Sequence, residues 1–129
     1  MLRKIFLAVT GLAFAGYGLM CLFVPETVGD AAELGLASEV AVAEVRAMYG
    51  GLQLSIGVLS LLAIFRPALE KTALLSLCFL FAGLAGGRLF AIALASGAGA
   101  YNYAAFGYEA VSVLVAIALV RAGGSAETA

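Results

Sequence analysis

Four long apolar stretches make up most of the chain, and polar residues fall mainly between them. The first two, Ile5–Val24 and Ala47–Phe65, are uncharged, whereas Ala73–Leu94 and Tyr101–Val120 hold one charged residue each. A helix of about 20 apolar residues crosses the hydrocarbon core of a bilayer, and no alternating pattern of barrel strands competes. We therefore expect an all-α, polytopic membrane four-helix bundle, a single domain over residues 1–129 whose spans are numbered one to four in chain order.

Composition supports the membrane assignment. Of 129 residues, 64% are hydrophobic and 12% are charged, and the mean hydropathy is +1.12. A soluble domain is usually about 45–50% apolar and about 25% charged, so this chain has too little polar surface to cover a soluble core. The net charge of −1 offers no basic surface for nucleic acid. Soluble, disordered and nucleic-acid-binding classes are excluded.

The connection between the first and second spans, Pro25–Arg46, holds five of the eight acidic residues. Ser38 followed by Glu39 is typical of a helix N-terminus, since a serine can cap the helix and an acid in the first turn favours its dipole. The second helix is therefore predicted to begin near Glu39, outside the membrane. The stretch Thr27–Leu36 is a candidate short interfacial helix.

The distribution of basic residues predicts the orientation. Cytoplasmic loops are enriched in Lys and Arg, and five of the six basic residues that flank the spans fall on one side against Arg46 on the other. The five are Arg3, Lys4, Arg66, Lys71 and Arg121. We expect a multi-pass protein of the bacterial inner (plasma) membrane with both termini cytoplasmic and the acidic connection in the periplasm.

The N-terminal segment also has features of a cleavable signal peptide. Arg3 and Lys4 precede a short apolar run, and Ala13-Phe14-Ala15 imitates a cleavage site. However, the apolar run continues through Gly16–Val24, where a mature N-terminus would turn polar. A membrane span is the favoured interpretation.

Each span carries one polar side chain at a similar depth. At about 1.5 Å per residue, Tyr17, Gln53, Arg88 and Glu109 lie about 9–12 Å below the periplasmic ends of their spans. A charge inside the bilayer normally faces the bundle interior and is paired. Arg88 and Glu109 are therefore expected to form an interhelix ion pair, either as a structural clamp or as part of a ligand or ion site.

Polar stripes extend this layer toward the periplasmic side. Residues at helical spacing share a face, and in the second span such a face carries a cation, a phenol and an amide between glycines. It comprises Arg46, Tyr49, Gly50, Gln53 and Gly57, and the fourth span has a similar stripe of Asn102, Ala105, Glu109, Ser112 and Ala116. A cavity is predicted there, with Arg46, Tyr49, Gln53, Arg88, Glu109 and Tyr17 as candidate ligand-binding residues.

Several small residues are expected to serve helix packing. Glycines let helices approach closely in membranes, and Gly83 and Gly87 form the spacing of a packing motif. Gly50 and Gly57 are expected to act in the same way in the second span. Cys21 and Cys78 differ by about 20 Å in predicted depth, too far for a disulfide.

The sequence lacks the residues that most kinds of catalytic site require. The chain has no His, and its two cysteines are separated, so the usual zinc, haem and Cys–His nucleophile sites have no ligand set. No phosphate-binding glycine loop stands in a strand–loop–helix setting. We expect no metal, no cofactor and no catalytic residue, and we favour a protein that is not an enzyme.

Two segments resemble a known family. They are Ala43-Glu44-Val45-Arg46-Ala47-Met48-Tyr49-Gly50-Gly51-Leu52-Gln53-Leu54-Ser55-Ile56-Gly57 and Gly86-Gly87-Arg88-Leu89-Phe90, with Glu109 later. The family is an uncharacterised domain-of-unknown-function family of small four-span bacterial membrane proteins, distantly DoxX-like. The resemblance implies a fold and no activity, and it marks Glu44, Arg46, Tyr49, Gly50, Gly51, Gly57, Gly87, Arg88 and Glu109. In the turn after the third span the family often has an Asp-Gly and a Pro, and residues 95–99 of this chain depart from that pattern.

Three functions are compatible with these features. The leading hypothesis is a binding or carrier protein for a small molecule such as a lipid, quinone or isoprenoid, held at the polar layer inside the bundle. The alternative is a structural or accessory subunit that docks into a larger membrane complex, or a homo-oligomer, through its glycine-rich helices. A quinone-linked redox subunit in which Glu109 moves protons is the third.

Overall fold

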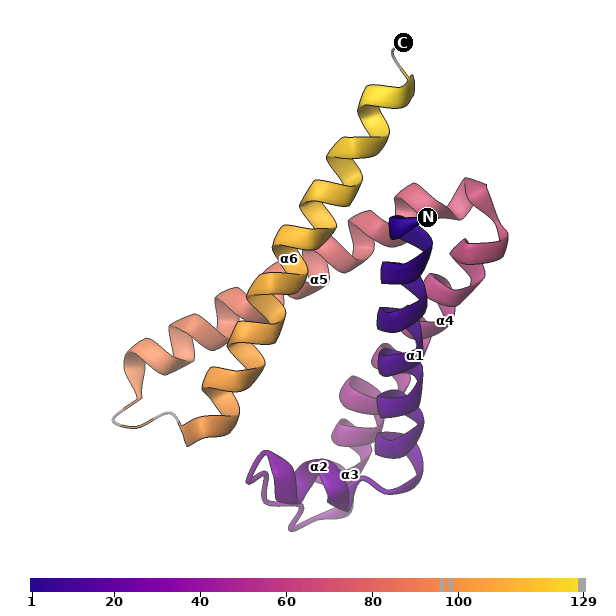
Figure 1. Cartoon of the computed structure of the whole chain (residues 1–129). Coiled ribbons are helices and arrows are strands. Elements are labelled where there is room, and N and C mark those ends of the chain that lie inside the picture. The colour runs from indigo at the N-terminus through magenta and orange to yellow at the C-terminus, as the bar shows by residue number, and fades with distance from the viewer. Residues whose placement is uncertain (96, 98, 128–129) are drawn as a thin grey trace. The chain divides into compact units, whose positions relative to one another are not determined.

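Seven helical segments follow one another along the chain in the computed structural model, which describes residues 1–95, 97 and 99–127 (Figure 1). Of residues 31 and 123–127 it describes the backbone alone, and it contains no strand in these ranges. The segments are α1 (Leu2–Phe23), α2 (Glu26–Ala31), α3 (Glu39–Val45), the π-helix η1 (Arg46–Gly51), α4 (Leu52–Phe65), α5 (Pro67–Leu94) and α6 (Gly99–Glu127).

Four helical stretches are long and apolar enough to cross a membrane, as the hydropathy pattern predicts. They are Leu2–Phe23, Glu39–Phe65, Pro67–Leu94 and Gly99–Ala122, the second being α3, η1 and α4 in continuous succession. The all-helical class and the number of membrane-length helices are confirmed. The turn expected at residues 95–100 lies partly outside the described residues, since 96 and 98 are not among them.

The predicted start of the second helix is also confirmed. α3 begins at Glu39, and the Ser38 hydroxyl accepts a hydrogen bond from the Ala41 backbone N–H at 3.2 Å. The predicted interfacial stretch Thr27–Leu36 overlaps the short α2, which ends at Ala31. The third helix begins earlier than the predicted span Ala73–Leu94, at Pro67, because proline suits the first helical position and Glu70 favours the first turn.

The helices divide into two compact units, and each is described by itself. Unit 1 is Met1–Ala73 and unit 2 is Leu74–Ala129. Unit 1 contains α1 to α4 and the first turns of α5, and unit 2 contains the rest of α5 and α6. The single domain, the packing of all four spans into one bundle and the polar layer common to them stay predictions.

Unit 1 is built on a close antiparallel contact of α1 with η1 and α4. A Cβ added at Gly18 would lie 2.5 Å from the Leu54 backbone nitrogen and 2.8 Å from the Gly50 carbonyl oxygen. At Gly57 it would overlap the backbone of Ala15. Only glycine lets the two backbones approach this closely, so Gly50 and Gly57 lie in a helix interface.

The end of unit 1 near α2 has its own apolar cluster. Cys21, Val28 and Val45 are buried together, and Tyr17 and Leu36 pack against them. This cluster holds the connection between α1 and α3 against the end of α1. It positions the residues that line the groove described below.

Unit 2 is a helical hairpin of α5 and α6. The rings of Phe81 and Tyr108 meet edge to face, with centroids 5.7 Å apart, a favourable geometry for an aromatic pair. No described atom of a neighbouring helix in unit 2 lies within 4 Å of a Cβ built at Gly83 or Gly87, so neither glycine makes a close helix contact within this unit. Cys78 in this unit and Cys21 in unit 1 are both free thiols.

Candidate functional site

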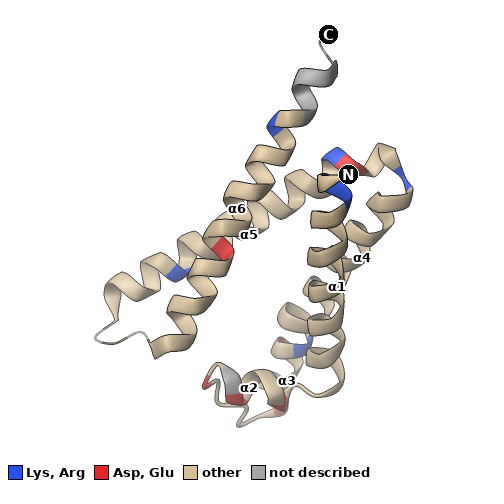
Figure 2. Cartoon of the chain, in the orientation of Figure 1, with Lys and Arg blue, Asp and Glu red and all other residues tan. Residues whose placement is uncertain are grey.

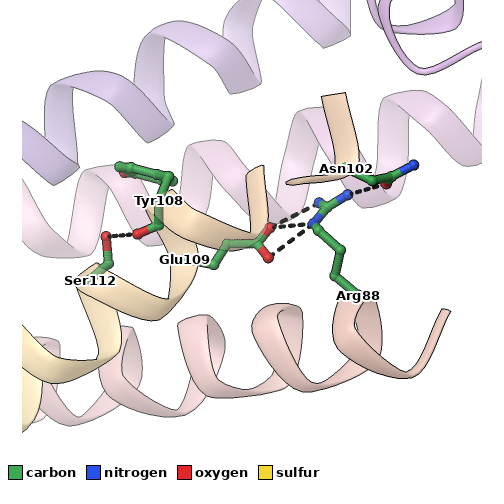
Figure 3. A network of polar contacts seen from close by, with 5 residues as sticks. All are labelled: Arg88, Asn102, Tyr108, Glu109 and Ser112. Atoms are coloured by element: carbon green, nitrogen blue, oxygen red, sulfur yellow. Dashed lines mark hydrogen bonds and ion pairs between the residues drawn. The ribbon is translucent and has the colours of Figure 1, made fainter. Parts of the chain in front are cut away.

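An arginine–carboxylate pair joins α5 to α6 in unit 2. The Arg88 Nη2 group donates to Glu109 Oε1 at 2.8 Å, and Nε donates to Oε1 and Oε2 at 3.1 and 3.0 Å (Figure 3). This is a two-pronged contact, the strongest geometry for the two groups. The side chains are 21% and 6% exposed, so the pair is largely buried.

The remaining groups of Arg88 are also engaged. Its Nη1 donates to Asn102 Oδ1 at 2.9 Å, and its guanidinium carbon lies 5.7 Å from the centre of the Tyr101 ring. Asn102 precedes Glu109 by seven residues, two helical turns, so one face of α6 supplies both hydrogen-bond acceptors. One turn further along α6, Ser112 donates to the Tyr108 carbonyl oxygen at 2.8 Å (Figure 3).

This network limits what the pair can do chemically. Every nitrogen of the Arg88 guanidinium donates to a side chain of α6, and Glu109 accepts three of these hydrogen bonds. A ligand that drew Arg88 away from Glu109 would have to replace these hydrogen bonds inside an apolar environment. The arrangement favours the structural clamp of the two alternatives that the sequence leaves open.

A groove of about 1040 Å³ lies in unit 1, where α1 ends and α3 begins. Its lining is mostly apolar, with one cation and one anion. The lining residues are Leu22, Leu36, Ala37, Ser38, Glu39, Val42, Ala43, Arg46, Ala47 and Gly51. The volume lies just above the range usual for small-molecule sites, about 300–1,000 Å³.

Arg46 is the basic residue of this groove, at the junction of α3 and η1. Its Nε donates to the Leu22 carbonyl oxygen at 3.1 Å, near the C-terminus of α1, where a cation complements the helix dipole. That bond uses one of three guanidinium nitrogens. Among the described residues, the two terminal amino groups of Arg46 have no hydrogen-bond partner, so they can bind an anionic or carbonyl group.

The π-helix changes the face on which the second-span candidates lie. Its hydrogen bonds join residues five rather than four apart, and such bulges often occur at functional sites. The expected stripe divides: Gly50 and Gly57 are buried against α1, whereas Tyr49 is exposed and Gln53 is half-buried. Within the described part of the chain, neither Tyr49 nor Gln53 forms a hydrogen bond.

The structure thus places the six candidate residues in four settings. Arg88 and Glu109 meet in unit 2, and Arg46 lines the groove of unit 1. Tyr17 packs against the apolar cluster of unit 1, and Tyr49 and Gln53 lie on the second span without polar partners. No group of three or more potential metal ligands occurs among the residues that were placed.

Sequence reasoning missed most of the groove. Its α3 wall is one helical face with the spacing i, i+3, i+4 and i+7, formed by Glu39, Val42, Ala43 and Arg46. That spacing is visible in the sequence. What the sequence does not reveal is that Leu22 and Leu36 lie opposite this face, since that depends on the fold of residues 24–38.

The geometry so far defines a class of protein: a multi-pass, all-helical membrane protein with four membrane-length helices. The sequence matches the family described as "Domain of unknown function (DUF4345)" over residues 2–120. The chain therefore belongs to this family. No curated protein and no solved structure matches it. The bacterial origin and the distant likeness to DoxX-like proteins stay predictions.

Proposed function

We propose that this protein binds a small amphiphilic molecule, such as a lipid, quinone or isoprenoid, in the groove of unit 1. The observation that carries the proposal is the available guanidinium of Arg46 beside an apolar lining. An apolar site with a few placed polar groups is the usual form of a small-molecule site. Arg46 would hold the polar head, and Leu22, Leu36 and Val42 would contact the apolar part.

The charge distribution of unit 1 supports a periplasmic location of this groove, in the inner membrane of a bacterium. Because α1 and α4 run antiparallel, the basic residues at the start of α1 and at the α4–α5 junction lie at the same end. There the Arg3 Nη1 group pairs with Glu70 Oε1 at 2.9 Å. Most acidic residues gather at the opposite end, around α2 and α3 (Figure 2). The basic end would be cytoplasmic.

The first test removes the guanidinium of Arg46. The full-length protein is extracted from membranes in mild detergent, and retained lipids and quinones are measured by native mass spectrometry. Arg46→Gln is expected to retain at least about tenfold less amphiphile than wild type, because a hydrogen bond to a charged group contributes about 1.5–3 kcal/mol. Arg66→Gln removes an exposed arginine of the same unit outside the groove, and its retention should equal wild type.

A second variant guards against a folding effect of Arg46→Gln, since Arg46 also bonds to the end of α1. Ala43 is exposed and lines the groove, so Ala43→Phe narrows it while leaving the Arg46 hydrogen bond in place. Loss of amphiphile in both variants, with unfolding temperatures near wild type, supports the proposal. Retention unchanged in both would overturn it. A protein that carries no amphiphile but co-purifies with another membrane protein would favour the accessory-subunit alternative.

A further inference from the structure

We infer that the molecule in the groove carries both a phosphate and a primary ammonium, as the headgroup of an ethanolamine phospholipid does. This inference rests on the proposed function and narrows it to one ligand class. It starts from the charges of the groove, which are one guanidinium, Arg46, and one carboxylate, Glu39. The groove is therefore neutral overall but strongly polarised along its length.

Glu39 and Arg46 do not neutralise each other. They are seven residues apart, at the start of α3 and just after its end, which separates their Cα atoms by about 10 Å along the axis. Among the described residues, neither is within the 4.0 Å of an opposite charge that defines an ion pair. Each charge is thus available to a ligand, and the two lie on the same side of the groove.

A ligand with a single charge would satisfy only one of them. An anion bound to Arg46 would leave Glu39 in the same groove without a counterion. A cation bound to Glu39 would leave Arg46 without one. A zwitterion pairs both charges at once. A primary ammonium also donates three hydrogen bonds, which a carboxylate can accept, whereas the quaternary ammonium of choline donates none.

The place of the groove in the fold fits a phospholipid better than a free headgroup. Glu39 and Arg46 flank the apolar Val42 along the chain, and Leu36 and Leu22 also line the groove. The groove lies where α1 ends and the second membrane-length helix begins. This is the level at which a spanning helix leaves the hydrocarbon core and meets the headgroups. A headgroup held there leaves its acyl chains free to follow the apolar surface of the helices.

The test titrates delipidated full-length protein in detergent with phosphatidylethanolamine, phosphatidylcholine and phosphatidylglycerol, read by native mass spectrometry. Wild type is expected to bind the ethanolamine lipid about tenfold more tightly than the other two. This factor corresponds to the one charge-assisted hydrogen bond, from the ammonium to Glu39, that only this lipid makes. Glu39→Gln should abolish that preference while phosphatidylglycerol still binds. Glu44→Gln, an exposed acid of the same helix outside the groove lining, should keep the preference.

Each other outcome decides against the inference. A wild-type preference for phosphatidylglycerol, or a preference unchanged in Glu39→Gln, would overturn the zwitterionic headgroup and leave lipid binding itself intact. Soluble glycerophosphoethanolamine that binds as tightly as the intact lipid would overturn the phospholipid as the occupant. Absence of binding of all three phospholipids would likewise overturn the phospholipid as the occupant, whereas the proposed function fails only if Arg46→Gln and Ala43→Phe retain as much amphiphile as wild type.

Discussion

Replacing Gly18 by alanine is expected to destabilise unit 1 by roughly 1–3 kcal/mol, since overpacking of this size costs about that much. The new methyl group would lie 2.5 Å from the Leu54 nitrogen, 2.8 Å from the Gly50 oxygen and 2.9 Å from the Leu54 Cα. All three atoms belong to the backbone, so rotation of a side chain cannot relieve the clash. The helices α1 and α4 must separate, and their contact is the main packing of the unit.

The matched control is Gly16→Ala in the same helix. No described atom lies within 4 Å of a Cβ at Gly16, and alanine is the better helix former by about 0.5–1 kcal/mol. The two variants add the same atom two residues apart, so only the α1–α4 contact distinguishes them. Thermal unfolding in detergent should lower the midpoint for Gly18→Ala and leave it unchanged or raised for Gly16→Ala. Equal midpoints would contradict the close approach of the two backbones.

Cys21 provides a local measurement for the same pair of variants. Its side chain is fully buried in the apolar cluster one turn beyond Gly18. Separation of α1 from η1 and α4 should expose the thiol, so N-ethylmaleimide should label Cys21 faster in Gly18→Ala than in wild type. Cys78, which lies in unit 2, serves as the reference thiol in the same sample.

Hydropathy was sufficient for the number of membrane-length helices because the length of an apolar run directly limits what can cross a bilayer. It was insufficient for helix ends and for local winding. Charges at Glu70 and Lys71 interrupt the apolar run but not the helix, so α5 begins at Pro67. The π-helix over Arg46–Gly51 has a sequence that also fits an α-helix. The close approach of α1 at Gly18 and Gly50 is a tertiary feature that the local pattern does not contain.

The candidate site could also be predicted only in part from the sequence. The depths estimated from the sequence place Arg88 and Glu109 at one level, because a short turn joins their helices. In the structure the Arg88 Nη2 and Glu109 Oε1 atoms are 2.8 Å apart. Asn102 lay in the stripe that the sequence indicates, although its bond to Arg88 could not be predicted. The groove depends on Leu22 and Leu36 lying opposite α3. Such a long-range arrangement leaves no periodic signal in the sequence.

Removing one member of the Arg88–Glu109 pair is expected to destabilise unit 2 by about 3–5 kcal/mol, because the survivor is left as a buried, uncompensated charge. Arg88→Leu also leaves Asn102 without the partner that it has at 2.9 Å. The double variant, Arg88→Leu with Glu109→Leu, should be more stable than either single variant, since two apolar side chains of similar volume replace both charges. Unfolding of the four proteins in detergent gives the coupling energy as a double-mutant cycle.

The control is the other ion pair, Arg3–Glu70, which has nearly the same length of 2.9 Å but a more exposed carboxylate. Its cycle with glutamine should give a smaller coupling energy than the Arg88–Glu109 cycle, because both of its side chains are more exposed, at 30% and 21%. Equal coupling in the two cycles would contradict a clamp built on burial.

Amphiphile retention in the double leucine variant separates the remaining alternatives. A folded variant that keeps its ligand leaves the groove at Arg46 as the site, whereas a folded variant that loses it makes Arg88 and Glu109 part of the site.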